Sequence, residues 1–106
     1  MPRASQGPAT VTEAYALLGT DGYCLVDVRS PEEVRAKGVS GARNIPLENL
    51  ATEARSLAGY TTIHVLCRSG GRSAMGTNLL HELGLTQAQN VSGGILAWEA
   101  AGLPII

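Results

Sequence analysis

The segment from residue 61 to residue 83 holds a strand pattern, a glycine-rich loop and a helix pattern in direct succession. Its first six residues, Thr61-Thr62-Ile63-His64-Val65-Leu66, are mostly apolar and β-prone, and apolar residues recur at helical spacing from Met75 onward. Between them stands the loop Cys67-Arg68-Ser69-Gly70-Gly71-Arg72-Ser73. A strand that turns directly into a helix is the repeating unit of parallel α/β sheets, so this segment predicts that fold class.

The rest of the chain continues the alternation of helices and strands. The capping-box motif Thr10-x-x-Glu13 predicts a helix that stops near Gly19, and Ser30-Pro31-Glu32-Glu33 predicts a second one that ends by Gly38. Apolar spacing predicts further helices over residues 47–57, over about 72–84, and around Trp98. Short apolar runs predict strands at 24–28, 42–45, 61–66 and 90–91.

Strands that are apolar throughout are typical of a parallel sheet covered on both faces. We therefore expect an α/β fold in one domain, residues 10–106, with a central, mostly parallel sheet of about five short strands and helices on both faces. Residues 1–9 are polar and rich in Pro and Gly, and we expect them to form a mobile N-terminal tail.

Composition excludes several classes of protein. The chain has 106 residues, 44% of them apolar, and a formal net charge of -1, so nothing points to nucleic acid or a membrane surface as a partner. No apolar run approaches the roughly 20 residues of a membrane span, and no signal peptide is visible. Two cysteines without C-x-x-C spacing argue against a disulfide scaffold and a zinc site. We expect a cytoplasmic monomer without metal or organic cofactor.

Cys67 has the surroundings of a reactive thiol. Glycines let successive backbone N–H groups turn toward one point, and a helix N-terminus adds positive charge there. A free thiol has a pKa near ~8.5, and such a cradle lowers it. No Asp or Glu lies between Ala54 and His81, whereas Arg68 and Arg72 flank the glycines. The loop therefore predicts a thiolate nucleophile and a small anionic substrate, bound by residues Arg68, Ser69, Gly70, Gly71, Arg72 and Ser73.

The order of four motifs along the chain resembles that of the single-domain rhodaneses, a family of sulfurtransferases. The motifs cover nearly the whole chain from about Thr10. They are Leu25-Val26-Asp27-Val28-Arg29-Ser30-Pro31-Glu32-Glu33, Ser40-Gly41-Ala42-Arg43-Asn44-Ile45-Pro46, the Cys67–Ser73 loop, and residues 91–104 with the sequence VSGGILAWEAAGLP.

The resemblance implies a two-step reaction. Cys67 would take the outer sulfur of a donor such as thiosulfate as a persulfide, and a thiophilic acceptor, cyanide or a thiol, would then remove it. Arg68 and Arg72 would attract the anionic donor, and the backbone from Arg68 to Ser73 would hold the added sulfur. Ser73 would cap the following helix or donate to sulfur.

Two other functions stay open. A persulfide carrier, which passes sulfur to a partner protein in a relay, would use the same cysteine. Related cysteine phosphatases and arsenate reductases have a loop one residue longer, whereas four residues separate Cys67 from Arg72, which favours a single sulfur over a tetrahedral oxyanion. Ser69 and Arg68 match neither the thiosulfate nor the mercaptopyruvate pattern of the family, so the donor stays open. Gly38 stands where the family often has His, which concerns packing.

Other residues are given structural roles. Asp27 and Arg29 end a strand next to the loop, and we expect them to support the site, Asp27 as a hydrogen-bond acceptor and Arg29 as an ion-pair partner. Cys24 is expected to be an inert core thiol, and His64 a hydrogen-bonded core residue rather than a base. Trp98 is expected in the core or over the sheet.

Overall fold

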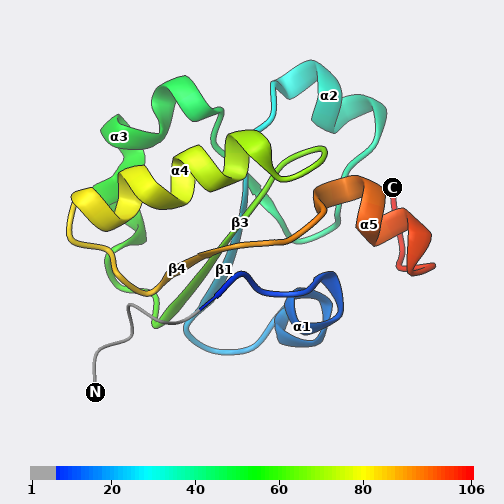
Figure 1. The fold of residues 1–106 in the computed structure, drawn as a ribbon, viewed down its shortest axis with the longest axis horizontal. Helices are drawn as coiled ribbons and strands as arrows, with labels where there is room; N and C mark the ends of the chain where they lie inside the picture. The colour runs from blue at the N-terminus through cyan, green and yellow to red at the C-terminus, as the bar shows by residue number, and fades with distance from the viewer. Residues whose placement is uncertain (1–6) are drawn as a thin grey trace.

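The structure is a computed structural model that describes residues 7–106. Four strands form one parallel sheet in the order β2-β1-β3-β4, with helices on both of its faces (Figure 1). This confirms the predicted α/β class. The strands are β1 (Tyr23–Asp27), β2 (Arg43–Asn44), β3 (Thr62–Leu66) and β4 (Ala88–Asn90).

The helices divide between the two faces of the sheet. The helices α1 (Val11–Leu17) and α5 (Gly94–Ala100) pack against each other on one face, and α3 (Leu50–Glu53) and α4 (Gly71–Glu82) pack on the other. The remaining helix, α2 (Pro31–Ala36), follows β1. Both predicted capping boxes are formed: the side chains of Thr10 and Ser30 each accept from the backbone N–H of the glutamate three residues later, whose carboxylate accepts from the backbone N–H of the capping residue.

Neighbouring residues of β1 and β3 supply two separate cores. Val26, Ile63 and Val65 join one apolar cluster with α3 and α4, whereas Leu25 and Leu66 join another with α1 and α5. Side chains alternate between the two faces of a strand, and both faces are covered here. The central strands β1 and β3 are therefore mostly apolar, whereas the edge strands β2 and β4 are mostly polar.

The edge of the sheet differs from the prediction of about five strands. Beyond β4, Ala9 makes a single parallel bridge to Val91, and this contact stands where a fifth strand would lie. The expected N-terminal tail covers residues 1–9, of which residues 1–6 lie outside the described part of the chain. Ala9 itself is buried, so the folded part begins at least one residue before Thr10.

The prediction of one continuous helix over residues 47–57 was wrong, because the segment is divided into three short helical turns. The segment forms a 3₁₀ turn (Leu47–Asn49), the short helix α3, and a second 3₁₀ turn (Ala54–Leu57). Ser56 Oγ donates to the Glu53 carbonyl over 2.6 Å, so a side chain takes a carbonyl that an uninterrupted helix would use. The apolar face is kept nevertheless, because Leu50, Ala54 and Leu57 are all buried against the sheet.

Two further findings concern residues 7–106 only. None of the helices in this range has both the length and the apolar character needed to cross a membrane. Within the same range, the His, Cys, Asp and Glu side chains form no group of three that could hold a metal ion.

Candidate active site

Cys67 lies immediately beyond the carboxyl end of β3, at the edge of the sheet where ligands bind in parallel α/β folds. The neighbouring strand β1 ends at the same level, since Asp27 stands opposite Leu66 in the register. Cys67 is only 1% exposed, so its thiol is enclosed by the loop that follows it.

The loop turns back over the sulfur as the sequence predicted. The Gly70 N–H donates to Cys67 Sγ over 3.1 Å, and Ser73 Oγ lies 3.2 Å from the same atom. Gly70 has a φ of +115°, a backbone conformation that side chains other than glycine rarely adopt, and α4 begins at the next residue. Arg68, Ser69 and Gly71 form the exposed outer surface of the loop.

Hydrogen bonds control the acidity of the Cys67 thiol. Burial by itself raises the pKa of Cys67, but the Ser73 hydroxyl and the backbone N–H groups of Ser73, Gly70 and Ser69 lower it by more. The net pKa is below the ordinary value for a thiol, which agrees with the expected thiolate. Hydrogen bonds from the neutral donors of the loop are the main cause of the lowered pKa.

Backbone N–H groups at the start of α5 bind the outer side of the Cys67 loop. Ile95 and Leu96, at the start of α5, donate their backbone N–H groups to the carbonyls of Cys67 and Arg68 over 2.9 and 3.1 Å. Gly94 allows this approach: its φ is +58°, and a Cβ there would overlap the Cys67 carbonyl oxygen. Since α5 satisfies these carbonyls, the loop can turn its N–H groups toward sulfur.

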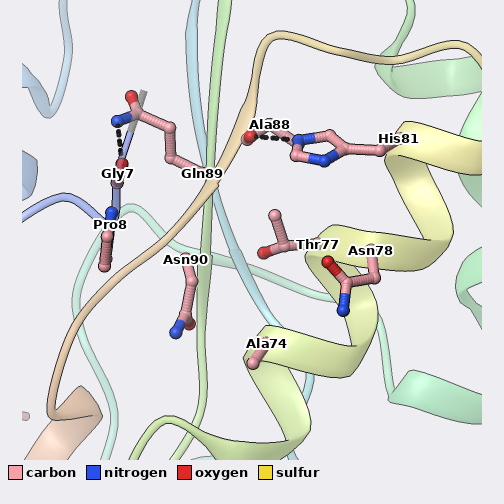
Figure 2. A pocket seen from close by; sticks show the side chains of 9 residues that line it. All are labelled: Gly7, Pro8, Ala74, Thr77, Asn78, His81, Ala88, Gln89 and Asn90. Carbon is pink, nitrogen blue, oxygen red and sulfur yellow. Dashed lines mark hydrogen bonds between the residues drawn. The ribbon is translucent and has the colours of Figure 1, made fainter. Parts of the chain in front are cut away.

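Asn90, at the end of β4, completes the hydrogen-bond network and was missed by the sequence reasoning. Ser73 Oγ lies within hydrogen-bond distance of both Asn90 Oδ1 and Cys67 Sγ and donates its one proton to one of them at a time. Asn90 Nδ2 donates to the Gly70 carbonyl over 3.4 Å. Asn90 also forms one wall of a pocket of about 180 Å³ between α4, β4 and residues 7–8 (Figure 2). The position of Asn90, a polar residue at the carboxyl end of a strand, could have indicated that it belongs to the site.

The two loop arginines have different surroundings. Arg68 is exposed and takes part in none of the ion pairs found among residues 7–106. Arg72 is half-buried and bonds with both terminal nitrogens to Glu33, over 2.7 and 2.9 Å. The sequence reasoning assigned Glu33 only to a helix cap, because its distance from Arg72 along the chain hides the contact.

The supporting pair forms at the end of β1. Asp27 and Arg29, 1% and 3% exposed, are joined through three side-chain contacts of 2.7 to 3.2 Å. Asp27 also accepts from the Arg29 backbone N–H, and Arg29 donates to the Lys37 carbonyl over 2.8 Å. The pair ties α2 to the sheet beside the Cys67 loop, as a buried structural contact.

The remaining predictions concern residues of the core. Cys24 pairs in register with Ile63, four residues before Cys67, so the two cysteines lie about 13 Å apart along parallel strands, too far for a disulfide. His64 is buried and bonded to Tyr23 and Gln89, which confirms a core role. Trp98 is fully buried, as expected.

Comparison with known proteins gives a consistent result. The family described as the rhodanese-like domain matches residues 10–101. A sulfurtransferase of Allochromatium vinosum is 31% identical over 85% of this chain and 84% of its own length. The chloroplastic thiosulfate sulfurtransferase 16 of Arabidopsis thaliana is 34% identical, and the match covers 98% of each chain.

The fold agrees with these sequence matches. The crystal structure of a rhodanese-related protein from Thermoplasma volcanium superposes with a TM-score of 0.83 and 29% identity, covering 94% of this chain and 97% of that one. The chain thus belongs to the rhodanese-like domain family.

Proposed function

We propose that this protein is a sulfurtransferase that carries a sulfane sulfur on Cys67, from a donor such as thiosulfate to cyanide or a thiol. The observation that carries the proposal is the buried Cys67 sulfur, which a backbone N–H and a hydroxyl approach within 3.2 Å. Donors of this kind stabilise negative charge on sulfur before and after it gains a second sulfur atom. The sulfurtransferase relatives described above support the same reaction class.

The reaction divides into two displacements at sulfur. In the first, the Cys67 thiolate attacks the outer sulfur of thiosulfate; a new S–S bond forms, the bond to the inner sulfur breaks, and sulfite leaves with the electron pair. In the second, cyanide attacks the outer sulfur of the persulfide and leaves as thiocyanate, which returns the thiolate. Both steps use the loop residues Arg68 to Ser73 and need no cofactor.

The test combines intact mass with a turnover assay. The protein is treated with thiosulfate, and a gain of one sulfur atom is expected in the wild type but not in Cys67→Ser. Added cyanide then removes that sulfur and produces thiocyanate over many turnovers. Absence of the gain with thiosulfate, hydropersulfide and mercaptopyruvate donors contradicts the proposal and reopens the cysteine phosphatase reading, which Cys67-dependent hydrolysis of an aryl phosphate tests.

A persulfide carrier is the second candidate, and the burial of Cys67 favours it. A thiol that is 1% exposed gives a small acceptor little access, so a partner protein would have to open the loop. A persulfide that persists on Cys67, with slow release to cyanide and fast release to a sulfur-relay partner, distinguishes the carrier from the enzyme.

A further inference from the structure

The charges around Cys67 are more nearly balanced than the loop sequence suggests. The sequence supplies two arginines to the loop, yet Arg72 meets the carboxylate of Glu33 in a two-point contact. Both members of the pair are roughly two-thirds covered, with side-chain exposures of 39% and 32%. The buried Asp27–Arg29 pair next to the loop is also neutral as a unit. Arg68 is thus the loop cation without a carboxylate partner in the described chain.

Glu33 is held in place from the other side as well. Its Oε1 accepts from the Ser30 backbone N–H over 3.1 Å, as part of the capping box that begins α2. The hydrogen bonds from Arg72 and Ser30 lower the pKa of Glu33 to about 2, so this carboxylate is charged at neutral pH. An anionic substrate must compete with it for Arg72.

We propose that Glu33 determines which sulfur donor the site accepts, by occupying Arg72 and so disfavouring a dianion relative to a donor of low net charge such as an alkyl hydropersulfide. This inference rests on the proposed sulfur transfer. Thiosulfate carries two negative charges to a thiolate that carries one, and it needs both loop cations to offset their repulsion. With Arg72 paired, Arg68 alone remains for this purpose.

A hydropersulfide does not meet the same obstacle. The Cys67 thiolate attacks its terminal sulfur, a new S–S bond forms, the S–S bond of the donor breaks, and the donor thiolate leaves with the electron pair. The proton stays on the transferred sulfur, so atoms and charges balance. The hydropersulfide reacts in its protonated form, whose S–S–H group is uncharged, so its approach needs no second cation and the Glu33 carboxylate does not repel the reacting group.

The experiment measures how fast Cys67 gains sulfur, without any acceptor. Rapid quenching and intact mass give a second-order rate constant for thiosulfate and for cysteine hydropersulfide. In Glu33→Gln, we expect thiosulfate loading to rise about fivefold, because Arg72 is released, and hydropersulfide loading to stay within about twofold. Glutamine keeps the helix start, since either Glu or Gln completes a capping box.

Two further variants test whether the change in thiosulfate loading requires loss of a carboxylate at position 33. Glu33→Asp keeps the carboxylate, and its thiosulfate rate should stay within about twofold of the wild type. Glu32→Gln removes the same charge one residue away, at an exposed side chain that pairs only loosely with Arg35 over 3.9 Å, and should leave both rates unchanged. A thermal melt of each variant verifies the fold.

The outcomes separate the two proposals. If neither donor loads Cys67 in the wild type, the proposed function fails. If both load it but their ratio is the same in Glu33→Gln, or changes equally in Glu32→Gln, sulfur transfer stands and the role of Glu33 is overturned. If Glu33→Gln does not fold, Glu33→Ala, which also removes the carboxylate, decides: an unchanged ratio of thiosulfate to hydropersulfide loading in that variant contradicts the inference.

Discussion

The ends of β1 and β3 lie side by side and both bear an arginine, yet they are chemically opposite. At the end of β1, Asp27 and Arg29 satisfy each other, and Arg29 gives a further hydrogen bond to the carbonyl of Lys37, the residue that caps the end of α2. At the end of β3, the donors of the loop converge on one sulfur atom. We call the β1 end closed, because the Asp27 carboxylate accepts the hydrogen bonds of Arg29, and the β3 end open, because its loop presents more hydrogen-bond donors than acceptors to the sulfur.

The difference lies in the backbone and in its neighbours. The β3 loop contains Gly70 in a conformation that turns its N–H group inward, and α5 binds the carbonyls on the outside of the loop. At the β1 end, the Asp27 carboxylate accepts the backbone N–H of Arg29, so this N–H group is not available to a ligand. A strand end in this fold therefore becomes a reactive site when its donors outnumber its own acceptors.

The largest expected effect comes from removing the sulfur that the loop surrounds. In Cys67→Ala, transfer from thiosulfate to cyanide should fall by at least about a thousandfold, because no other group can accept the sulfur covalently. The thiocyanate assay measures it. Cys24→Ala is the matched control: this thiol is buried near the opposite end of the strands, and activity should persist. Retained turnover in Cys67→Ala would exclude the mechanism.

The next effect falls on stability and concerns the closed strand end. Asp27→Asn should lower the free energy of unfolding by about 3 kcal/mol, because it leaves the Arg29 guanidinium buried without its charge partner. Urea denaturation measures the loss. Glu32→Gln, which breaks the exposed pair with Arg35, should cost less than about 0.5 kcal/mol. Equal losses in the two variants would show that burial does not matter here.

These two strand ends also show what sequence reasoning can reach. Cys67, the loop and the order of strands and helices were predictable, because local spacing and glycine content determine them. Asn90 and Glu33 were not assigned their contacts, since they meet the loop across 17 and 39 residues. Local patterns do not encode which distant side chains come together at a strand end.

The helix over residues 47–57 shows the same limit at smaller scale. The apolar spacing correctly identified the buried face with Leu50 and Leu57. It did not reveal that Ser56 would bond to the Glu53 carbonyl and divide the segment, because side-chain competition for the backbone depends on rotamers. Periodicity predicts which residues face the core and leaves the type of turn undetermined.

An added acceptor should make the open strand end resemble the closed one. Asn90→Asp places a carboxylate one hydroxyl group away from Cys67 Sγ, through Ser73. Repulsion between like charges raises the pKa of Cys67, so the thiolate forms only at higher pH, and alkylation by iodoacetamide at pH 7 should slow about tenfold. The pH profile of alkylation measures this. Asn78→Asp, exposed on α4 in the same pocket, should not shift the profile.

Removal of one donor should have a smaller effect in the same direction. Ser73→Ala takes away a hydroxyl that lowers the pKa of Cys67, so that pKa rises and the alkylation profile moves to higher pH. One hydrogen bond to a charged group is lost, and the rate at neutral pH should fall about fivefold. Ser92→Ala, an exposed serine beyond β4, is the control. An unchanged profile would mean that the backbone N–H groups suffice.

The smallest effect is expected at Arg68, where a cation acts on the open strand end from outside. Arg68→Ala should raise the apparent KM for thiosulfate about threefold and leave kcat nearly unchanged, because an exposed charge attracts the donor but does not touch the thiol. Added salt should reduce the difference between variant and wild type, since it screens exposed charges. Arg55→Ala removes the same charge elsewhere on the surface and should leave KM unaltered. A fall in kcat at constant KM would place Arg68 among the groups that contact the reacting sulfur. The distinction between the donors next to sulfur, Gly70 and Ser73, and the exposed Arg68 cation would then be wrong.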